Sequence, residues 1–355
     1  MIRQNLIGKT LVNGFVIEKL RSSAALHPSG ACHSIGFIAK APDGRLAFVK
    51  VLDPTLDTAA LDPLVDLKTR LDSFLYERDV VFKTRDRKLR SVVRALGEGT
   101  LDQNDTGVGN AATYLLFELA TGDLREQVDL SRRFDLAYRL RVLHNTAKGL
   151  SQLHLSHIAH QDLKPSNVVT FDRTSRGEID TTKIADLGHA HDRQAPRPGA
   201  DRVIAGDPSY APPEQLYNSC PSDWVARRFA ADLYQLGGLS VFLMTGVGAT
   251  ELIGGHLRPE HHWDVWLGGS YADILPHLVE ATDAVLEDLA QATDELVREE
   301  VVELTKMLLD PDPTRRAHPK NLDGAGAPYG LERFISRFNV LAEKAEWALG
   351  RAVSR

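Results

Sequence analysis

The chain has 355 residues, of which 43% are hydrophobic and 25% charged, and its formal net charge is −6. These proportions are those of an ordinary globular protein and exclude global disorder. The acidic balance gives no general attraction to phosphate backbones or anionic lipids, so we expect neither nucleic acid nor a membrane as partner.

The cysteines and the first residues bear on the compartment. Cys32 and Cys220 are the two cysteines, which is too few for a disulfide framework and fits a reducing environment. The first residues contain no apolar stretch of signal-peptide length. The longest uncharged stretch, Leu233 to Thr250, fits a buried helix better than a bilayer span. We therefore expect a cytoplasmic protein without a membrane segment.

The first third of the chain alternates short β-type runs with turn signals, at 14–20, 35–41 and 46–52. The turn between the last two is PDG, in which Pro presets the first turn angle and Gly accepts a positive one. Residues 63–90 change to helical spacing, with Leu64, Leu67, Leu71, Phe74 and Leu75 recurring at three and four. Further strand signals follow at 91–101 and 112–120.

From about Gly122 onward helical patterns dominate, at 139–155, 231–244 and 296–310. A β-rich front with one helix, followed by a longer helical part, predicts an α+β fold in two lobes. The tail, 330–355, has the pattern of one last amphipathic helix.

Five short motifs stand in a fixed order along the chain. They are FVKVL with Lys50 on a strand, YERDVV with Glu77 on the following helix, HQDLKPSN from His160 to Asn167, DLG from Asp186 to Gly188, and YAPPE ending at Glu214. Order and context together resemble the eukaryotic-type (Hanks-type) serine/threonine protein kinase family. The resemblance covers roughly residues 10–335. Because Gln161 replaces the Arg that usually precedes the catalytic Asp, the resemblance is to the non-RD subtype.

The resemblance implies a phosphoryl-transfer site. Such a site positions a triphosphate and neutralises its charge. Lys50 is then the cation on the α- and β-phosphates, with Glu77 orienting it. Asp162 accepts the proton of the substrate hydroxyl, and Lys164 stabilises the transferring phosphate. The implied Mg²⁺ ligands, with Mn²⁺ as a possible replacement, are Asn167 and Asp186.

The resemblance also implies how ATP is held. The carbonyl of Glu118 and the amide of Ala120 would bind adenine, with Phe117 guarding the pocket behind. Asp123 would reach the ribose, although a helix N-cap is an equally good interpretation. Gly30 is the one glycine in the segment where a Gly-rich phosphate loop belongs.

Two further matches are architectural. Asp232 stands at the start of a helix pattern, where the family uses an Asp to hold the backbone of the catalytic loop. Arg316 stands where the family pairs an Arg with the Glu of the APPE segment, here Glu214.

Three departures from the family pattern affect the interpretation. The phosphate loop is poor in glycine. Phe48 replaces a small residue over adenine, and Gly36 on the facing strand replaces a larger one, so we expect total volume to be kept. Asp207 stands where a Thr usually bonds Asp162 and Lys164; it could accept from Lys164, but as a like charge it would raise a carboxylate pKa or repel the triphosphate.

The activation segment has no Ser, Thr or Tyr between Asp186 and Pro208. Kinases of the common type phosphorylate this segment and pair the phosphate with an Arg cluster that includes the residue here occupied by Gln161. This chain therefore lacks both the residue to be phosphorylated and the Arg that would bind the phosphate.

The resulting prediction is an ATP- and Mg²⁺-dependent serine/threonine kinase acting on protein substrates, without control by activation-loop phosphorylation. The predicted kinase domain is 10–335, with an N-lobe at 10–119, a C-lobe at 120–335 and a C-terminal helix at 336–355 packed on the C-lobe. One alternative is a pseudokinase that senses nucleotide or binds proteins. A second is a small-molecule phosphotransferase, against which the LKPSN loop, the YAPPE segment and Arg316 argue.

Overall fold

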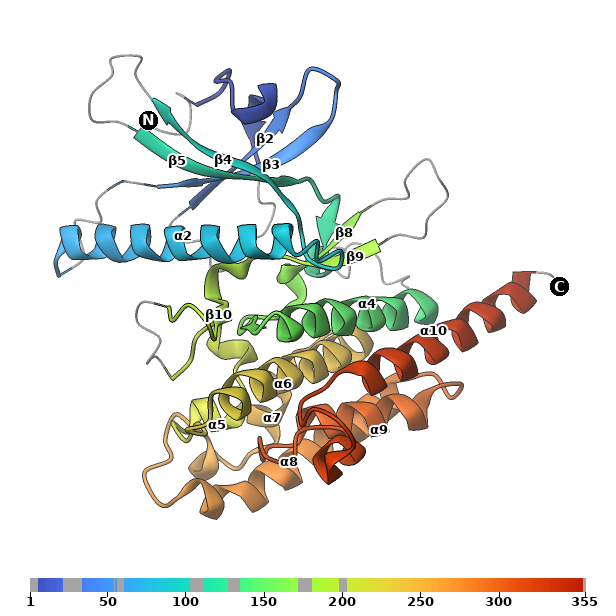
Figure 1. Cartoon of the computed structure of the whole chain (residues 1–355). Helices are drawn as coiled ribbons and strands as arrows, with labels where there is room; N and C mark the ends of the chain where they lie inside the picture. The colour runs from blue at the N-terminus through green and yellow to red at the C-terminus, as the bar shows by residue number, and fades with distance from the viewer. Residues whose placement is uncertain are drawn as a thin grey trace. The chain divides into compact units, whose positions relative to one another are not determined.

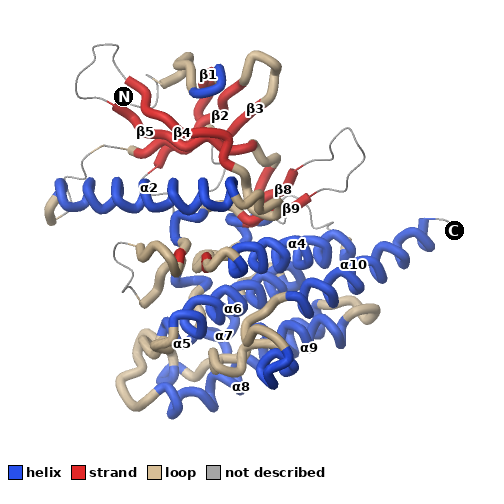
Figure 2. Tube along the Cα trace, in the orientation of Figure 1, coloured by secondary structure: helices blue, strands red, loops and turns tan. Residues whose placement is uncertain are grey.

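A computed structural model describes the chain as two compact units. It covers residues 6–21, 34–53, 55, 61–102, 111–126, 135–171, 181–197 and 203–353. Unit 1 contains the described residues up to Gly122 together with 170–171, and unit 2 contains the others. Strands dominate unit 1 and helices dominate unit 2 (Figures 1 and 2).

Unit 1 is built on an antiparallel five-stranded sheet of order β1-β2-β3-β5-β4. The strands are β1 (Val16–Leu20), β2 (Ser34–Lys40), β3 (Leu46–Leu52), β4 (Ala95–Asp102) and β5 (Ala111–Glu118), and a 3₁₀ turn at Val12–Gly14 precedes them. The predicted PDG turn joins β2 to β3: Ala41 N donates to Arg45 O at 2.8 Å, and Gly44 has φ +87°. The turn prediction is confirmed.

Helix α2 (Pro63–Asp86) is the single long helix described in unit 1, as expected. Asp62 caps its first turn by accepting from Leu64 N and Val65 N at 3.0 and 3.1 Å. The repeated leucines do not all face the core, because Leu64 is 70% and Leu71 38% exposed.

Phe74 and Arg70 are the buried side chains in the first half of α2, and Arg70 is the charged one. Its guanidinium donates to Asp53 O at 3.0 Å and Thr55 O at 2.8 Å, which ties α2 to the segment after β3. The helical spacing therefore predicted the helix correctly, but of the five residues that carried it only Phe74 is buried.

Unit 2 is mainly helical. Its long helices are α4 (Leu136–Leu155), α6 (Trp224–Thr245), α7 (Ala249–His256), α8 (Tyr271–Ala292), α9 (Arg298–Leu309) and α10 (Glu332–Val353), with a short α5 (Pro213–Leu216). Short strands β7 (Ile158–Ala159) and β10 (His191–Asp192) pair with each other, and β9 is Thr181–Ile184. β6 (Gly122–Asp123) and β8 (Val168–Phe171) are each divided between the two units.

Helix α6 is the core of unit 2, since nearly all its side chains after Phe229 are buried. Gly237 lets α9 approach closely, because a Cβ there would lie 2.9 Å from the side chains of Leu308 and Leu309. Within the described residues no single helix is long and apolar enough to cross a membrane; α6 and α7 pass only together, and they bend by 84° between them.

The C-terminal helix α10 packs along α4 (Figure 1). Arg141 on α4 donates to Glu346 at 2.7 Å and to Asn339 at 2.7 Å. The predicted amphipathic tail helix is thus present and lies on the helical unit. The predicted α+β class, with a β-rich front containing one helix and a larger helical part, is confirmed.

Candidate catalytic site

In unit 1 the predicted Lys50 and Glu77 form an ion pair. Lys50 Nζ on β3 lies 2.7 Å from Oε1 and 2.9 Å from Oε2 of Glu77 on α2. Both side chains are largely shielded from solvent, which strengthens a charge-assisted pair. The pair fixes the ammonium group at the middle of β3, opposite Gly36 and Leu115 in the register.

Phe48 fills the space that Gly36 leaves open. A Cβ built on Gly36 would lie 2.8 Å from Cε2 of Phe48, so the two positions cannot both carry side chains without movement. The ring also stacks on Phe117, with centroids 6.3 Å apart. The expected compensation of volume is confirmed.

Of the residues predicted to hold adenine and phosphate, the structure describes Glu118 and Ala120 but not Gly30. Glu118 is the last residue of β5, and its Oε1 accepts from Arg94 N at 2.8 Å. Ala120 follows β5 outside the strand. Gly30 lies outside the described residues.

Asp123 is the first residue of unit 2. Its Oδ1 accepts from Glu126 N at 3.0 Å, the hydrogen bond expected of a helix N-cap. Burial raises the pKa of this carboxyl, against that hydrogen bond. The structure thus contains the capping bond, and the role toward ribose stays a prediction.

In unit 2, Asp232 holds the backbone of the HQDLKPSN loop, as predicted. Its two carboxylate oxygens accept from His160 N and Gln161 N, both at 2.8 Å. His160 adds a second anchor, because its Nε2 lies 3.1 Å from Ala185 O and its Nδ1 accepts from Asp162 N. The loop is therefore fixed to α6 on one side and to the DLG segment on the other.

The Asp162 carboxylate is oriented from three sides. Oδ1 accepts from Asp207 N at 2.8 Å, and Oδ2 accepts from Asn167 Nδ2 at 3.0 Å. Lys164 Nζ lies 3.2 Å from the same Oδ2. Asp162, Lys164 and Asn167, predicted separately from one motif, thus contact one another directly.

Asp207 shares Lys164 with Asp162. Lys164 Nζ donates to Asp207 Oδ2 at 3.1 Å, as the sequence suggested it could. Burial alone would raise the pKa of Asp207, but the Lys164 ammonium and the Ser209 amide hold it below its ordinary value. Burial would lower the pKa of Lys164, and the two carboxylates raise it instead. The expectation of a raised carboxylate pKa is therefore wrong for Asp207, because the ammonium and the hydrogen bonds outweigh the effect of burial.

Gly206 packs directly on the catalytic loop. A Cβ at this position would lie 2.5 Å from Gln161 O and 2.6 Å from Oδ1 of Asp162. Only a residue without a side chain allows the end of the activation segment to approach Asp162 this closely.

Asn167 and Asp186 suit a hard cation such as Mg²⁺. Asn167 Nδ2 donates to Asp162 O at 2.8 Å and to Asp162 Oδ2 at 3.0 Å. The amide oxygen of Asn167, which is the atom able to bind a metal, therefore points the other way. Ala185 N donates to Asn167 O at 2.8 Å, which brings Asp186 beside this residue. Asp186 has φ +58°, and its Oδ1 accepts from Gly188 N at 3.2 Å. Carboxylate and amide oxygens are ligands that Mg²⁺ accepts, so these residues fit the ion.

Glu214 and Arg316 form the predicted buried ion pair. Arg316 Nη1 and Nη2 donate to Oε1 and Oε2 of Glu214, both at 2.8 Å. Both side chains are fully buried. The guanidinium also donates to Asp310 O, Ala230 O and Pro311 O, so its remaining three protons are used.

Arg228 on α6 is a residue that the sequence interpretation missed. Its guanidinium donates to Gln161 Oε1 at 3.0 Å, so it contacts the very position that departs from the family pattern. The available signal was its spacing: Arg228 precedes Asp232 by one helical turn, which puts both on one face of a helix whose Asp was already assigned to the loop.

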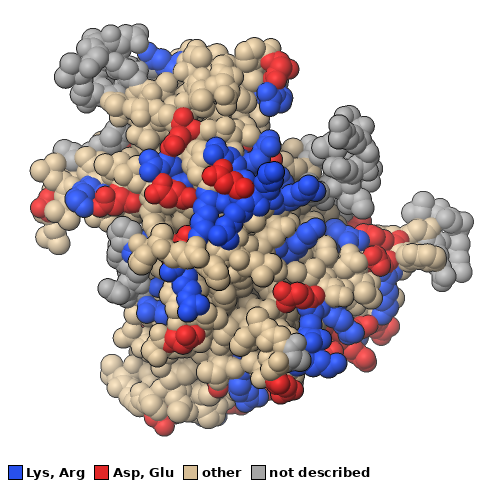
Figure 3. Space-filling model, in the orientation of Figure 1, with Lys and Arg blue, Asp and Glu red and all other residues tan. Residues whose placement is uncertain are grey.

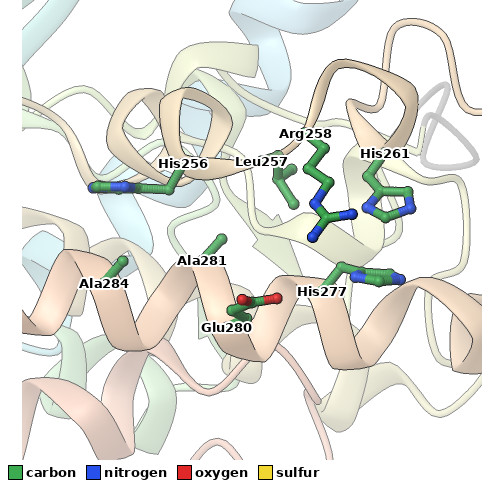
Figure 4. A pocket seen from close by; sticks show the side chains of 8 residues that line it. All are labelled: His256, Leu257, Arg258, His261, His277, Glu280, Ala281 and Ala284. Atoms are coloured by element: carbon green, nitrogen blue, oxygen red, sulfur yellow. The ribbon is translucent and has the colours of Figure 1, made fainter.

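Two surface features lie apart from these residues. A pocket of about 160 Å³ between α7 and α8 is lined by His256, Arg258, His261, His277 and Glu280 (Figure 4). It is smaller than the roughly 300–1,000 Å³ of sites for drug-sized ligands.

Lys and Arg side chains gather around the C-terminal end of α2 (Figure 3), where the basic run Lys83 to Arg90 continues beyond the helix end at Asp86.

Comparison with known proteins agrees with the geometry. The family model described as protein kinase domain matches residues 88–323. A probable serine/threonine-protein kinase pknA2 of Bifidobacterium longum is 28% identical over 143 residues, covering 40% of this chain and 17% of that protein. Serine/threonine-protein kinase pkn3 of Myxococcus xanthus is 28% identical over 195 residues (53% and 34%), and human serine/threonine-protein kinase H2 is 28% identical over 134 residues (38% and 32%).

The chain belongs to the protein kinase domain family, on the serine/threonine side of it. The aligned segments cover at most 34% of the length of these three relatives. The family match begins at residue 88, after Lys50 and Glu77, so the ion pair in unit 1 is an independent observation. The domain bounds 10–335 stay a prediction.

Proposed function

We propose that this chain transfers the γ-phosphoryl group of ATP to serine or threonine hydroxyls of protein substrates. Mg²⁺ is the proposed cofactor, with Mn²⁺ as a substitute, and the cytoplasm the proposed location. The observation that carries the proposal is the Asp162 carboxylate, held by Asp207 N and Asn167 Nδ2 with the Lys164 ammonium beside it.

The residues have distinct roles in this proposal. Asp162 accepts a hydrogen bond from the substrate hydroxyl and takes its proton as the oxygen attacks. Lys164 supplies positive charge next to that carboxylate. Lys50, held by Glu77, is the proposed cation for the nucleotide phosphates. Asn167 and Asp186 would hold Mg²⁺, which neutralises phosphate charge when bound.

The proposal includes independence from activation-segment phosphorylation. Residues 187–206 contain no hydroxyl side chain to phosphorylate, and position 161 carries a neutral amide. Phosphatase treatment of the purified chain should therefore leave its rate unchanged.

The decisive test is phosphate transfer from labelled ATP with Mg²⁺ to the chain itself and to a panel of proteins and peptides. Asp162→Asn should abolish transfer, while Asp264→Asn, an exposed Asp of unit 2, should retain it. Product analysis should find phosphoserine or phosphothreonine. Failure of the unaltered chain with every acceptor, Mg²⁺ or Mn²⁺, would remove the proposal.

Thermal melting of the same purified protein distinguishes an active kinase from a pseudokinase. A ligand that binds only the folded state raises the melting temperature. A shift with ATP and Mg²⁺ but no transfer would indicate a nucleotide sensor, and neither shift nor transfer a protein-binding module.

A further inference from the structure

Gln161 has a backbone conformation that its surroundings must enforce. Its φ is +67°, a left-handed value that a residue with a side chain adopts only with backbone strain. Asp232 accepts from its amide, and its carbonyl accepts from Gln235 Nε2 at 3.1 Å. Gln235 Oε1 accepts from Leu163 N at 2.9 Å. The residues on either side of Asp162 are thus held by α6.

The Gln161 side chain bridges a buried cation and a buried anion. Oε1 accepts from Arg228 Nη1 at 3.0 Å, and Nε2 donates to Asp232 Oδ1 at 2.9 Å and to Arg228 O at 2.7 Å. Exposure is 2% for Arg228, 3% for Gln161 and 0% for Asp232. An amide fits this position because it carries a donor and an acceptor at once.

The two ends of the bridge keep their charges at neutral pH. Burial, assisted by the neighbouring Arg227, lowers the pKa of Arg228 to about 10, which still leaves it protonated. Burial would raise the pKa of Asp232, but the hydrogen bond and charge of His154 hold it below its ordinary value.

We infer that Arg228 is a positioning residue for Asp162, acting through Gln161. The inference rests on the proposed function and specifies how it is regulated. In RD kinases, the members of the family that carry an Arg at position 161, this Arg needs an activation-segment phosphate as its partner. Here α6 supplies the arginine, already buried and already paired to the loop, so no phosphate is needed.

The pair also determines which residue type position 161 accepts. An Arg at 161 would place a second guanidinium against Arg228 with no additional carboxylate, and like charges at low dielectric repel strongly. The Gln is therefore the complement of Arg228. Exchanging the two residues keeps one arginine and one amide in the same space.

A double-mutant cycle tests this inference. Gln161→Arg and Arg228→Gln are made singly and together, with Arg315→Gln, an exposed arginine of unit 2, as control. Each single change should lower kcat at least tenfold, about 1.4 kcal/mol, with the KM for ATP changed less than threefold. The exchange should recover most of the loss, and the control should stay within about twofold of the unaltered chain.

Melting temperatures keep the test valid where a single variant folds poorly. The exchanged variant should melt above both single variants. Unchanged kcat in Arg228→Gln, or an exchanged variant no better than the product of the single effects, overturns the inference. If the unaltered chain transfers no phosphate, the proposed function fails by itself, and non-additive melting temperatures still decide whether Gln161 and Arg228 act as a unit.

Discussion

Lys164 Nζ donates to the carboxylate of Asp207 at 3.1 Å and lies 3.2 Å from the carboxylate of Asp162. One ammonium group is therefore divided between two carboxylates. Asp207→Thr removes one negative charge and keeps a hydroxyl for hydrogen bonding. Because Lys164 would then attract a transferring phosphoryl group more strongly, we expect kcat to rise about threefold to tenfold.

The Asp207→Thr experiment needs a comparison that removes both charge and acceptor. Asp207→Val should lower kcat, since Lys164 then loses a partner and gains none. Steady-state rates with ATP and Mg²⁺ measure both variants. A loss in Asp207→Thr as large as in Asp207→Val would contradict the idea that the second carboxylate restrains Lys164.

Arg316 and Glu214 allow a stability prediction. Arg316→Met leaves the Glu214 carboxylate buried without a counter-charge, so the free energy of unfolding should fall by about 3–5 kcal/mol. Arg316→Met with Glu214→Leu removes both charges and should recover part of that loss. Urea denaturation followed by circular dichroism measures the change. Arg315→Met, at an exposed neighbour, should change stability by less than about 0.5 kcal/mol.

Gly36 and Phe48 should behave as one packing unit. Gly36→Val alone forces its Cβ against the Phe48 ring and should destabilise the chain by about 1–3 kcal/mol. Gly36→Val with Phe48→Ala exchanges the large and the small side chain, so stability should return toward that of the unaltered chain. Equal destabilisation of the single and double variants in urea would show that the two positions are independent.

His191 gives the chain a pH dependence on the acid side. Burial, with the Arg228 charge adding to it, lowers the pKa of His191 to about 3. The unfolded state takes up a proton near the ordinary value of about 6.5, whereas the folded state does not. The free energy of unfolding is therefore unaffected by His191 above pH 6.5. It declines by up to about 1.4 kcal/mol per pH unit as the pH falls from 6.5 toward 3. His191→Asn should flatten melting temperature against pH between 4 and 6.5, and an unchanged slope would contradict the assignment.

The sequence predicted the groups whose chemistry demands a residue type in a fixed place. Lys50 with Glu77 and Arg316 with Glu214 could be paired from motifs alone, and both pairs are present. Contacts set by tertiary packing were harder to predict. Leu64 fits the helical spacing of α2 and is exposed, while Arg70 fits no apolar pattern and is buried, because backbone carbonyls after β3 satisfy it.

The contact made by the side chain at position 161 was also hard to predict from the sequence. Considered alone, Gln161 suggested the loss of an arginine, and the activation segment suggested the loss of a switch. Its actual partner lies 67 positions away along the chain, and the one signal for it was that Arg228 precedes Asp232, already assigned to the loop, by one helical turn. Neutral hydrogen-bonded bridges of this kind leave little trace in sequence, since any of several polar residues satisfies the local spacing.

The close approach of Gly206 to Asp162 offers a reagent for cell biology. Inactive kinases are usually made by deleting a charge, which also alters how the protein binds nucleotide, metal and partners. Gly206→Ala would keep every ionisable side chain and move the Asp162 carboxylate by pressing a methyl group against it. Such an allele would silence phosphate transfer while leaving nucleotide-induced thermal stabilisation in place, and so separate what the chain does by catalysis from what it does by its presence.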